Sequence, residues 1–291
     1  MSDRGRAGYC RFGAARLSEL GNRLARLDAE LVRRGLARSR EHAAELVAGG
    51  RVSVSGRAAT KPATQVVPAD PIVVDLAEPD PGYASRGAWK LAGALDAFAA
   101  RPTGGPRVAG RRCLDAGAST GGFTDVLLRR GAAAVVAVDV GYGQLAWRLR
   151  NDPRVEVHDR TNVRDLTPDQ IGPAAGLVVA DLSFIPLSLV LPALLRCAEP
   201  EADLVVMVKP QFEVGRERLG AGGVVRDPGL RAEAVRAVAA AARELGLGVR
   251  GVTASPLPGP SGNVEYFLWM HSAAPALDEG DLAAAMAAGP R

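Results

Sequence analysis

Lysine and cysteine are scarce in this sequence of 291 residues, and each shortage excludes something. Three widely spaced cysteines exclude a disulfide framework and a CxxC zinc site, so we expect no metal. Of the 36 basic residues only three are lysines, namely Lys61, Lys90 and Lys209. In a sequence that otherwise uses arginine for positive charge, a lysine can mark a site that needs an amine able to lose its proton. A guanidinium group cannot be deprotonated in a protein.

Long apolar runs are also missing. No run is longer than that from Ala132 to Val138, which is far too short to span a bilayer. No charged segment leads into an apolar one near Met1, so we expect no secretory signal, no membrane partner and a cytoplasmic protein. A hydrophobic content of 47% nonetheless predicts a folded core.

Positive charge is concentrated near the N-terminus. Residues 1–61 hold 13 Lys and Arg against 6 Asp and Glu, and the remainder is slightly acidic. This asymmetry indicates a module that binds a polyanion, with a solvated arginine-rich face as the alternative. Tyr9 and Phe12 are the only aromatic residues there, which favours contacts to charged groups such as phosphates over stacking. The candidate residues for binding such a polyanion are Arg26, Arg33, Arg34, Arg38, Arg40 and Arg51.

The chain changes character after about a quarter of its length. Leucines at helical spacing from Leu24, a glycine stop at Gly35 and a cap at Ser39 predict two short helices. Short strands follow, so this part reads as a small α+β unit. The predicted segments are a disordered basic tail (1–22), the small unit (23–77), a linker (78–84), a large domain (85–275) and a C-terminal tail (276–291).

Strands and helices alternate in the large domain. Apolar runs predict strands at 112–115, 133–139, 177–181, 204–208, 249–253 and 266–270, and helices lie between them at 124–130, 187–197 and 230–245. Continuous apolar strands joined by crossover helices indicate an α/β, Rossmann-like fold with a parallel sheet covered on both faces. Ligands of such sheets bind beyond the carboxyl ends of the strands.

The first of these strands ends in a glycine turn, CLDAGASTGG. Glycine at Gly117 and Gly121 lets the backbone approach a ligand, but the spacing is neither GxGxxG nor a phosphate-binding P-loop. Asp115, just before the turn, suits a ligand with an amine, such as S-adenosylmethionine. Asp139 ends the next strand, where a carboxylate can bind the hydroxyls of an adenosine ribose. The alternative is a nucleotide-binding α/β domain with a ligand other than S-adenosylmethionine.

Reactive side chains end two further strands. Asp181 follows LVVA and Lys209 follows VVMV, where a buried amine is costly unless it is paired or neutral. Lys90 and Glu265 are weaker candidates for catalytic residues, because each could instead be an ordinary charged residue on the surface. The residues after Asp181 are Leu-Ser-Phe and no cysteine is well placed as a nucleophile, which disfavours methylation of base nitrogen or carbon and leaves a hydroxyl acceptor.

These motifs, in order, resemble the TlyA family, in which an S4-type RNA-binding domain precedes an FtsJ-like methyltransferase domain. The resemblance runs from RLDAELVRRGLARSREHAAELVAGGRVSVSG through SRGAWKL, VDVGYGQLAW, ADLSFIPL and VKPQFEVG to SPLPGPSGNVEYFLW. It implies a class I S-adenosylmethionine-dependent enzyme that methylates the ribose 2′-hydroxyl of cytidine in 16S and 23S rRNA. Some members also carry a haemolysin label, which the missing signal and membrane segments disfavour.

The family's site residues transfer onto matching positions. The implied catalytic tetrad is Lys90, Asp181, Lys209 and Glu265, and the implied cofactor contacts are Asp115, Gly117, Ser119, Gly121, Phe123, Asp139 and Asn162. The alternatives are a ribosome-binding or assembly factor whose methyltransferase domain is vestigial, and a ribose methyltransferase that acts on another RNA.

Overall fold

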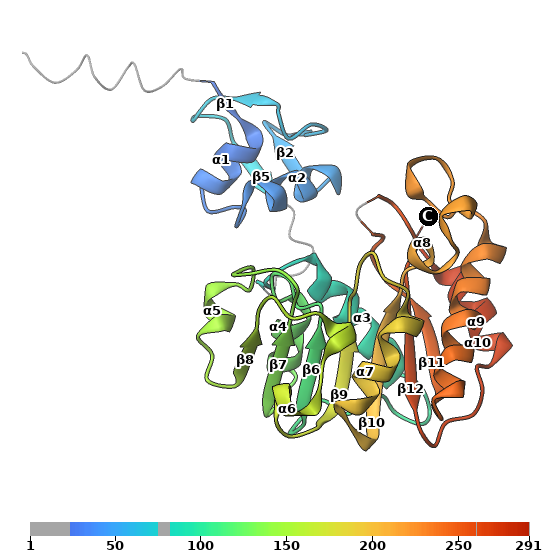
Figure 1. Cartoon of the computed structure of the whole chain (residues 1–291). Helices are drawn as coiled ribbons and strands as arrows, with labels where there is room; N and C mark the ends of the chain where they lie inside the picture. Colours follow the sequence, from blue (N-terminus) through green and yellow to red (C-terminus); the bar gives the residue numbers. More distant parts are fainter. Residues whose placement is uncertain (1–23, 75–81, 260, 291) are drawn as a thin grey trace, which may run out of the picture. The chain divides into compact units, whose positions relative to one another are not determined.

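The computed structural model describes residues 24–74, 82–259 and 261–290 (Figure 1). The chain divides into two compact units, Met1–Pro81 and Gly82–Arg291. The division falls inside the segment 78–84 that the sequence predicts as a linker. The predicted tail at 1–22 lies outside the described residues.

The first unit packs two helices on short strands. Helices α1 (Leu27–Arg33) and α2 (Arg40–Ala48) enclose a small core with a three-stranded antiparallel sheet in the order β3 (Arg57–Ala58), β2 (Val52–Val54) and β5 (Ile72–Val74). A second small sheet pairs β1 (Ala25–Arg26) with β4 (Gln65–Val66). The predicted cap is confirmed, because Ser39 Oγ accepts a hydrogen bond from the His42 backbone N–H.

The second unit is built on a sheet of seven strands in the order β11-β12-β10-β9-β6-β7-β8. The strands are β6 (Arg112–Ala116), β7 (Ala134–Val138), β8 (Val155–His158), β9 (Ala175–Ala180), β10 (Ala198–Val208), β11 (Gly248–Ala254) and β12 (Tyr266–His271). The predicted α/β class is therefore confirmed. Strand β8 was not predicted, because its sequence VEVH is short and alternates rather than forming an apolar run.

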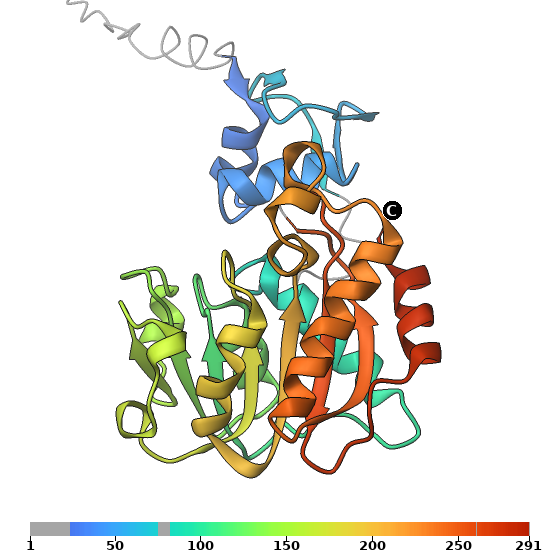
Figure 2. The ribbon, with the colours of Figure 1, turned by 45° about the vertical axis from the view of Figure 1, so that its right-hand side comes forward.

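Helices cover both faces of this sheet (Figures 1 and 2). One face carries α3 (Arg86–Ala99), α4 (Gly122–Arg129) and the short α5 (Trp147–Arg150). The other carries α6 (Pro168–Ile171), α7 (Leu191–Arg196), α9 (Pro228–Glu244) and α10 (Glu279–Ala288). Two apolar cores, one on each face, result from these layers.

The structure corrects three expectations about this unit. The sheet is mixed rather than parallel, because β12 runs antiparallel to both β10 and β11. The predicted helix at 187–197 is a 3₁₀ turn, Leu187–Leu189, followed by α7, which begins with a proline in its first turn. The predicted C-terminal tail contains α10, whose Leu282 and Ala285 are buried in the core.

Candidate active site

Three predicted catalytic residues lie at one edge of the large sheet. Asp181 follows β9, Lys209 follows β10 and Glu265 immediately precedes β12. Because β12 is antiparallel to β10, with Val208 paired to Tyr266, the next positions outward are Lys209 and Glu265. The strand direction that the sequence missed is therefore what brings Glu265 to the end where the parallel strands finish.

Lys209 is held between two side chains. Its Nζ lies 2.7 Å from Asp181 Oδ1 in an ion pair and donates a hydrogen bond of 2.9 Å to Ser183 Oγ. An ammonium group has three N–H donors and the hydrogen bond to Ser183 uses one of them, so donors remain for a further acceptor. The Lys209 side chain is 11% exposed and that of Asp181 is 23% exposed, so a substrate can reach the pair.

Lys90 and Glu265 form the second pair of the tetrad. Lys90 lies in the second turn of α3, and its Nζ donates a hydrogen bond of 2.6 Å to Glu265 Oε2. The Glu265 side chain is only 1% exposed, so the attraction between the two charged groups has to offset the cost of removing them from water. Gly259 lies against the other carboxylate oxygen, because a Cβ at that position would lie 2.6 Å from Glu265 Oε1.

Helix α3 links the two pairs. Gly87 lies one turn before Lys90, and a Cβ on Gly87 would be 3.9 Å from Asp181 Oδ2. The structure therefore gathers all four tetrad residues from α3, β9, β10 and β12 into one site. The Lys90–Glu265 pair is the more deeply buried of the two, and the Lys209–Asp181 pair is the more accessible.

The glycine turn after β6 packs directly on this site. Gly117 has φ +88°, and a Cβ there would lie 2.4 Å from the Asp181 carbonyl oxygen. Gly121 has φ +94°, and a Cβ there would lie 2.4 Å from a methyl group of Leu149. Any side chain at either position would push the turn away from its neighbours, so both glycines are required by the fold of the turn.

Asp139 ties the turn to the end of β7. Its two carboxylate oxygens accept hydrogen bonds from the backbone N–H groups of Ser119 at 2.8 Å and Gly141 at 2.7 Å. Ser119 adopts a left-handed conformation, with φ +48°, which turns its N–H towards this carboxylate. Each oxygen keeps a second lone pair for a ligand hydroxyl.

Asp115 is completely buried, and only one of its oxygens has a partner. Its Oδ2 accepts a hydrogen bond of 2.6 Å from Thr124 Oγ1, and Oδ1 has no hydrogen-bond partner. Burial, helped by the charges of Asp181 and Asp139, raises the pKa of Asp115 to about 7, although the bond from Thr124 opposes the shift. A buried orphan oxygen beside a glycine turn fits a cationic ligand that supplies the missing donor.

Phe123 and Asn162, also implied as cofactor contacts, both have neighbours within the protein. The Phe123 side chain is buried in the core, with its ring 6.0 Å from that of Phe267, so it packs α4 on the sheet instead of facing the turn. Asn162 is exposed, and its Oδ1 accepts a hydrogen bond from the Arg164 backbone N–H. That bond caps a 3₁₀ turn, Val163–Asp165, and brings Asn162 no contact with the glycine turn.

Two residues that the sequence did not single out belong to the site. Ser183 contacts Lys209, and Phe184 is 90% exposed with its ring 5.1 Å from that of Phe212. Phe184 also has φ +66°, a strained conformation for a bulky residue. An exposed ring held beside the reactive lysine offers a face for stacking on a base. In the sequence, the aromatic residue directly after the motif ADLS could have indicated Phe184 as part of the site.

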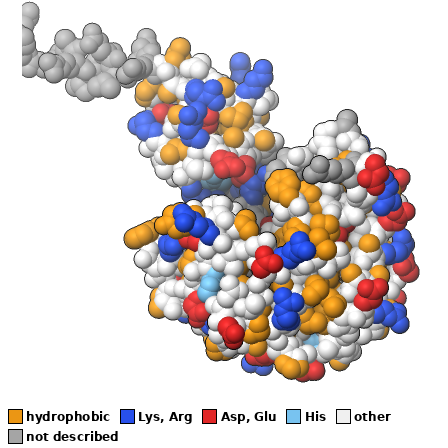
Figure 3. All heavy atoms as spheres, viewed as in Figure 1, with side chains coloured by type: hydrophobic (Ala, Val, Ile, Leu, Met, Phe, Trp, Pro, Cys, Tyr) orange, Lys and Arg blue, Asp and Glu red, His pale blue; other side chains and the backbone are white. Residues whose placement is uncertain are grey.

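Two buried carboxylates on α1 hold three of the predicted RNA-binding arginines. Asp28 accepts hydrogen bonds from Arg26 and Arg40, and Glu30 accepts two from Arg33. The bond from Arg26 lowers the pKa of Asp28 to about 2, and the bond from Arg33 does the same for Glu30. These guanidinium groups are about half exposed or more, so they remain open to phosphates; Figure 3 shows basic side chains on this unit.

Arg34 has a structural function that the sequence did not reveal. Its guanidinium donates to Glu30 and to the backbone carbonyls of Asp70 at 2.7 Å and Pro68 at 2.9 Å, and its side chain is only 20% exposed. Arg34 thereby joins α1 to the 67–70 turn, which corrects its assignment to the RNA-binding face. Arg38 and Arg51 also have interaction partners.

Within the described part of the chain, no group of three His, Cys, Asp or Glu residues could hold a metal ion. No helix among those residues is long and apolar enough to cross a membrane.

Comparison with known proteins agrees with this architecture. The FtsJ-like methyltransferase family matches residues 83–272, and the S4 domain matches residues 25–72. A Mycobacterium tuberculosis protein named 16S/23S rRNA (cytidine-2′-O)-methyltransferase TlyA is 64% identical over 86% of this chain and 91% of its own length. Hemolysin A of Brachyspira hyodysenteriae is 35% identical over 83% of this chain and 97% of its own.

A solved structure also matches both units in sequence order. A candidate hemolysin of Streptococcus thermophilus has a TM-score of 0.69 and 35% identity, covering 90% of this chain and 95% of that one. The matched domains, their order and the 64% identity leave one assignment. The chain belongs to the TlyA family, in which an S4 domain precedes an FtsJ-like methyltransferase domain.

Proposed function

We propose that this protein transfers the methyl group of S-adenosylmethionine to the ribose 2′-hydroxyl of cytidine in 16S and 23S rRNA, and that it does so in the cytoplasm. The observation that carries the proposal is the Lys209 amine, held between Asp181 and Ser183 and backed by the buried Lys90–Glu265 pair. The name of the M. tuberculosis relative supports this substrate and the ribose position.

The residues around the glycine turn fit S-adenosylmethionine. The orphan oxygen of Asp115 suits its amino group, and the remaining lone pairs of Asp139 suit its ribose hydroxyls. Gly117 and Gly121 allow the turn between these two carboxylates to pack closely on its neighbours. When bound, this cofactor supplies an activated methyl group on a sulfonium.

Lys209 acts on the acceptor hydroxyl. A remaining N–H donor allows it to orient the 2′-oxygen in line with the methyl group, and as a neutral amine it can accept the hydroxyl proton. The bound cofactor would supply the methyl group to the 2′-oxygen, and a neutral Lys209 amine would take the proton that this oxygen loses. Asp181 holds the amine in place through their 2.7 Å contact.

The direct test incubates the purified protein with unmodified small and large ribosomal subunits and labelled S-adenosylmethionine, and then maps 2′-O-methyl groups. We expect label on cytidine ribose in both subunits. Label on neither subunit, with cofactor binding intact, would overturn the proposal in favour of another RNA or an assembly factor with a vestigial domain.

Cofactor affinity should depend on pH through Asp115. Its pKa of about 7 means that the free protein keeps a proton there below neutrality, and an incoming cation must displace it. The affinity for S-adenosylmethionine should therefore rise about threefold to tenfold between about pH 6 and about pH 7.5. Isothermal titration calorimetry in two buffers should also detect the released proton.

Two variants separate Asp115 from another group that titrates in the same range. Burial also raises the pKa of Glu213 to about 7, and Glu213 accepts a hydrogen bond from the Leu187 backbone N–H. Asp115→Asn should remove the pH dependence, and Glu213→Gln should keep it. A pH dependence unchanged in Asp115→Asn would contradict the assignment.

The S4-type unit, residues 23–77, should bind rRNA through its exposed arginines. Replacing Arg33 and Arg40 together with alanine removes two guanidinium groups and leaves Glu30 paired with Arg34 and Asp28 paired with Arg26. We expect RNA binding to weaken by about tenfold. The plot of log affinity against log salt concentration should become less steep by the amount that corresponds to about two phosphate contacts. Filter binding at several salt concentrations measures both. An unchanged salt slope would remove this face from the interface.

A further inference from the structure

Two loops of the second unit meet at the reactive lysine, and a carboxylate outside the tetrad fastens one loop to the other. Helix α8 (Pro210–Glu213) directly follows Lys209, at the end of the sheet where β9 and β10 finish (Figure 1). Glu213, its last residue, accepts on Oε1 a hydrogen bond of 2.9 Å from the Leu187 backbone N–H. This bond ties the end of the loop that follows β9, residues 181–187 and here called the β9 loop, to the end of α8.

The Glu213 carboxylate is costly where it lies. Its side chain is largely buried, and this burial raises its pKa to about 7. Among the described residues its one hydrogen-bond partner is the Leu187 N–H, so no cation offsets the buried charge. Leu187 is 2% exposed and begins the 3₁₀ turn Leu187–Leu189, so its N–H has no partner within that turn. The carboxylate therefore supplies an acceptor that the β9 loop requires.

The bond holds one end of a strained stretch. Phe184 has φ +66°, which a bulky residue keeps only where its surroundings determine the backbone. One residue earlier, Ser183 Oγ accepts the 2.9 Å hydrogen bond from Lys209 Nζ. Three residues later, Leu187 donates its N–H to Glu213. Both contacts come from the same short segment after β10, so the strained stretch is fixed at each end.

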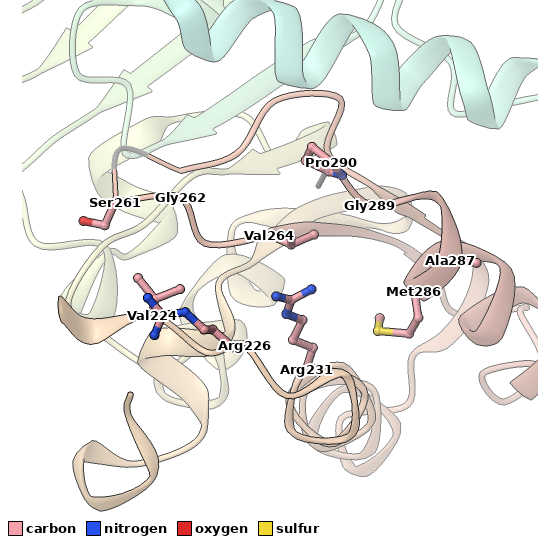
Figure 4. A pocket seen from close by; sticks show the side chains of 10 residues that line it. All are labelled: Val224, Arg226, Arg231, Ser261, Gly262, Val264, Met286, Ala287, Gly289 and Pro290. Carbon is pink, nitrogen blue, oxygen red and sulfur yellow. The ribbon is translucent and has the colours of Figure 1, made fainter. Parts of the chain in front are cut away.

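The segment that carries Glu213 is itself firmly placed. Val214 is 2% exposed in the core, and its backbone N–H closes the turn of α8 at 3.1 Å. Further along, the Val225 N–H donates to Asn263 Oδ1 at 2.9 Å, and Val224 lines a cavity of about 420 Å³ (Figure 4). Glu213 therefore acts on the β9 loop from a fixed base.

We propose that Glu213 is a positioning residue for methyl transfer, which acts by holding the β9 loop at Leu187. The bond keeps Ser183 against the Lys209 amine, and it keeps the exposed ring of Phe184 beside that amine. The inference rests on the proposed function, because it needs an acceptor ribose at Lys209. Glu213 touches neither substrate nor cofactor and acts through the β9 loop.

Three substitutions separate the hydrogen bond from the charge. Glu213→Met removes both, Glu213→Asp keeps the charge on a shorter side chain, and Glu213→Gln keeps an oxygen that can accept from Leu187. With ribosomal subunits as substrate, kcat should fall about 10- to 100-fold in the Met and Asp variants, because a small displacement of Ser183 misaligns the reacting groups. Glu213→Gln should retain most of the wild-type kcat.

The other constants should hardly change. The KM for the subunit should stay within about threefold of the wild-type value, since contacts made equally in the ground state are kept. The affinity for S-adenosylmethionine should be unchanged, because the glycine turn is untouched. Glu244→Met, which removes an exposed carboxylate at the end of α9, should match the wild type throughout. A residue that only supports the fold would not affect kcat alone.

Thermal melting and hydrogen exchange separate positioning from folding. Glu213→Met should melt close to the wild-type temperature, because the lost hydrogen bond is offset by the removal of a buried charge. Amide exchange in peptides that cover residues 182–190 should be faster in Glu213→Met and Glu213→Asp. Exchange in Glu213→Gln and Glu244→Met should match that of the wild type.

The outcomes that would overturn the proposal are distinct. A wild-type kcat in Glu213→Met, with exchange accelerated, would mean that the bond only completes a turn. A loss of kcat in Glu213→Gln equal to that in Glu213→Met would mean that the charge, not the bond, matters. If Glu213→Met failed to fold, Glu213→Asp would decide the same question, and a wild-type kcat there would overturn the proposal.

Failure of the proposed function would look different. If the wild type methylated neither subunit, that function would fail and the positioning role in methyl transfer with it. Hydrogen exchange needs no substrate, so it would then identify Glu213 as a contact of the fold alone. Unchanged kinetics in all three Glu213 variants, with wild-type methylation intact, would overturn only the positioning role.

Discussion

Lys209→Met should lower kcat for rRNA methylation by about 10²- to 10⁴-fold, the range expected when a positioned proton-transfer or orienting group is removed. The substituted side chain keeps the length of lysine but loses the amine that contacts Asp181 and Ser183. Cofactor affinity should change little, because the glycine turn and Asp139 are untouched. Single-turnover kinetics on ribosomal subunits, with calorimetry for the cofactor, measure both effects.

Lys209→Arg separates the two ways in which this lysine can act. A guanidinium can orient the 2′-oxygen but cannot accept its proton at neutral pH. Activity close to that of Lys209→Met would indicate that proton removal dominates, and substantial recovery would indicate orientation. Full activity in Lys209→Met would remove Lys209 from the catalytic site.

Lys90→Met should lower the free energy of unfolding by about 3–5 kcal/mol, because it leaves the Glu265 carboxylate buried without its partner. The double variant Lys90→Met with Glu265→Leu should recover most of that loss, since an apolar pair of similar size can replace a buried ion pair. Urea denaturation of the four proteins completes the double-mutant cycle.

Activity should follow a different pattern from stability in the same cycle. The double variant should remain far less active than the wild type, because the buried pair supports the site that also contains Lys209 and Asp181. Recovery of activity together with stability would mean that the pair serves only to hold the fold. A double variant no more stable than Lys90→Met would contradict the ion-pair argument.

Two of the four proposed reactive residues carry local signals in the sequence. Asp181 and Lys209 end apolar strands, and two of only three lysines fall in the tetrad. Gly117 was predicted as a glycine that lets the backbone approach a ligand, and the structure shows that the Asp181 carbonyl oxygen also requires a glycine at this position. The sequence did not reveal that the Phe123 side chain is buried in the core, because hydropathy alone does not say which way the side chain after a glycine turn points.

Composition and local pattern by themselves predicted the α/β class, the basic character of the first unit, the positions of most strands, and Asp181 and Lys209 as candidate reactive residues. Lys90 and Glu265 were weaker candidates, and the full tetrad was implied by the family resemblance. Only the tertiary structure decided which lysine pairs with which carboxylate, because those pairs join residues far apart in the chain, 175 positions for Lys90 and Glu265. The antiparallel direction of β12 and the structural bonds of Arg34 likewise depend on long-range packing. Hydrophobic periodicity records which face of a strand is buried but not its direction or its neighbours.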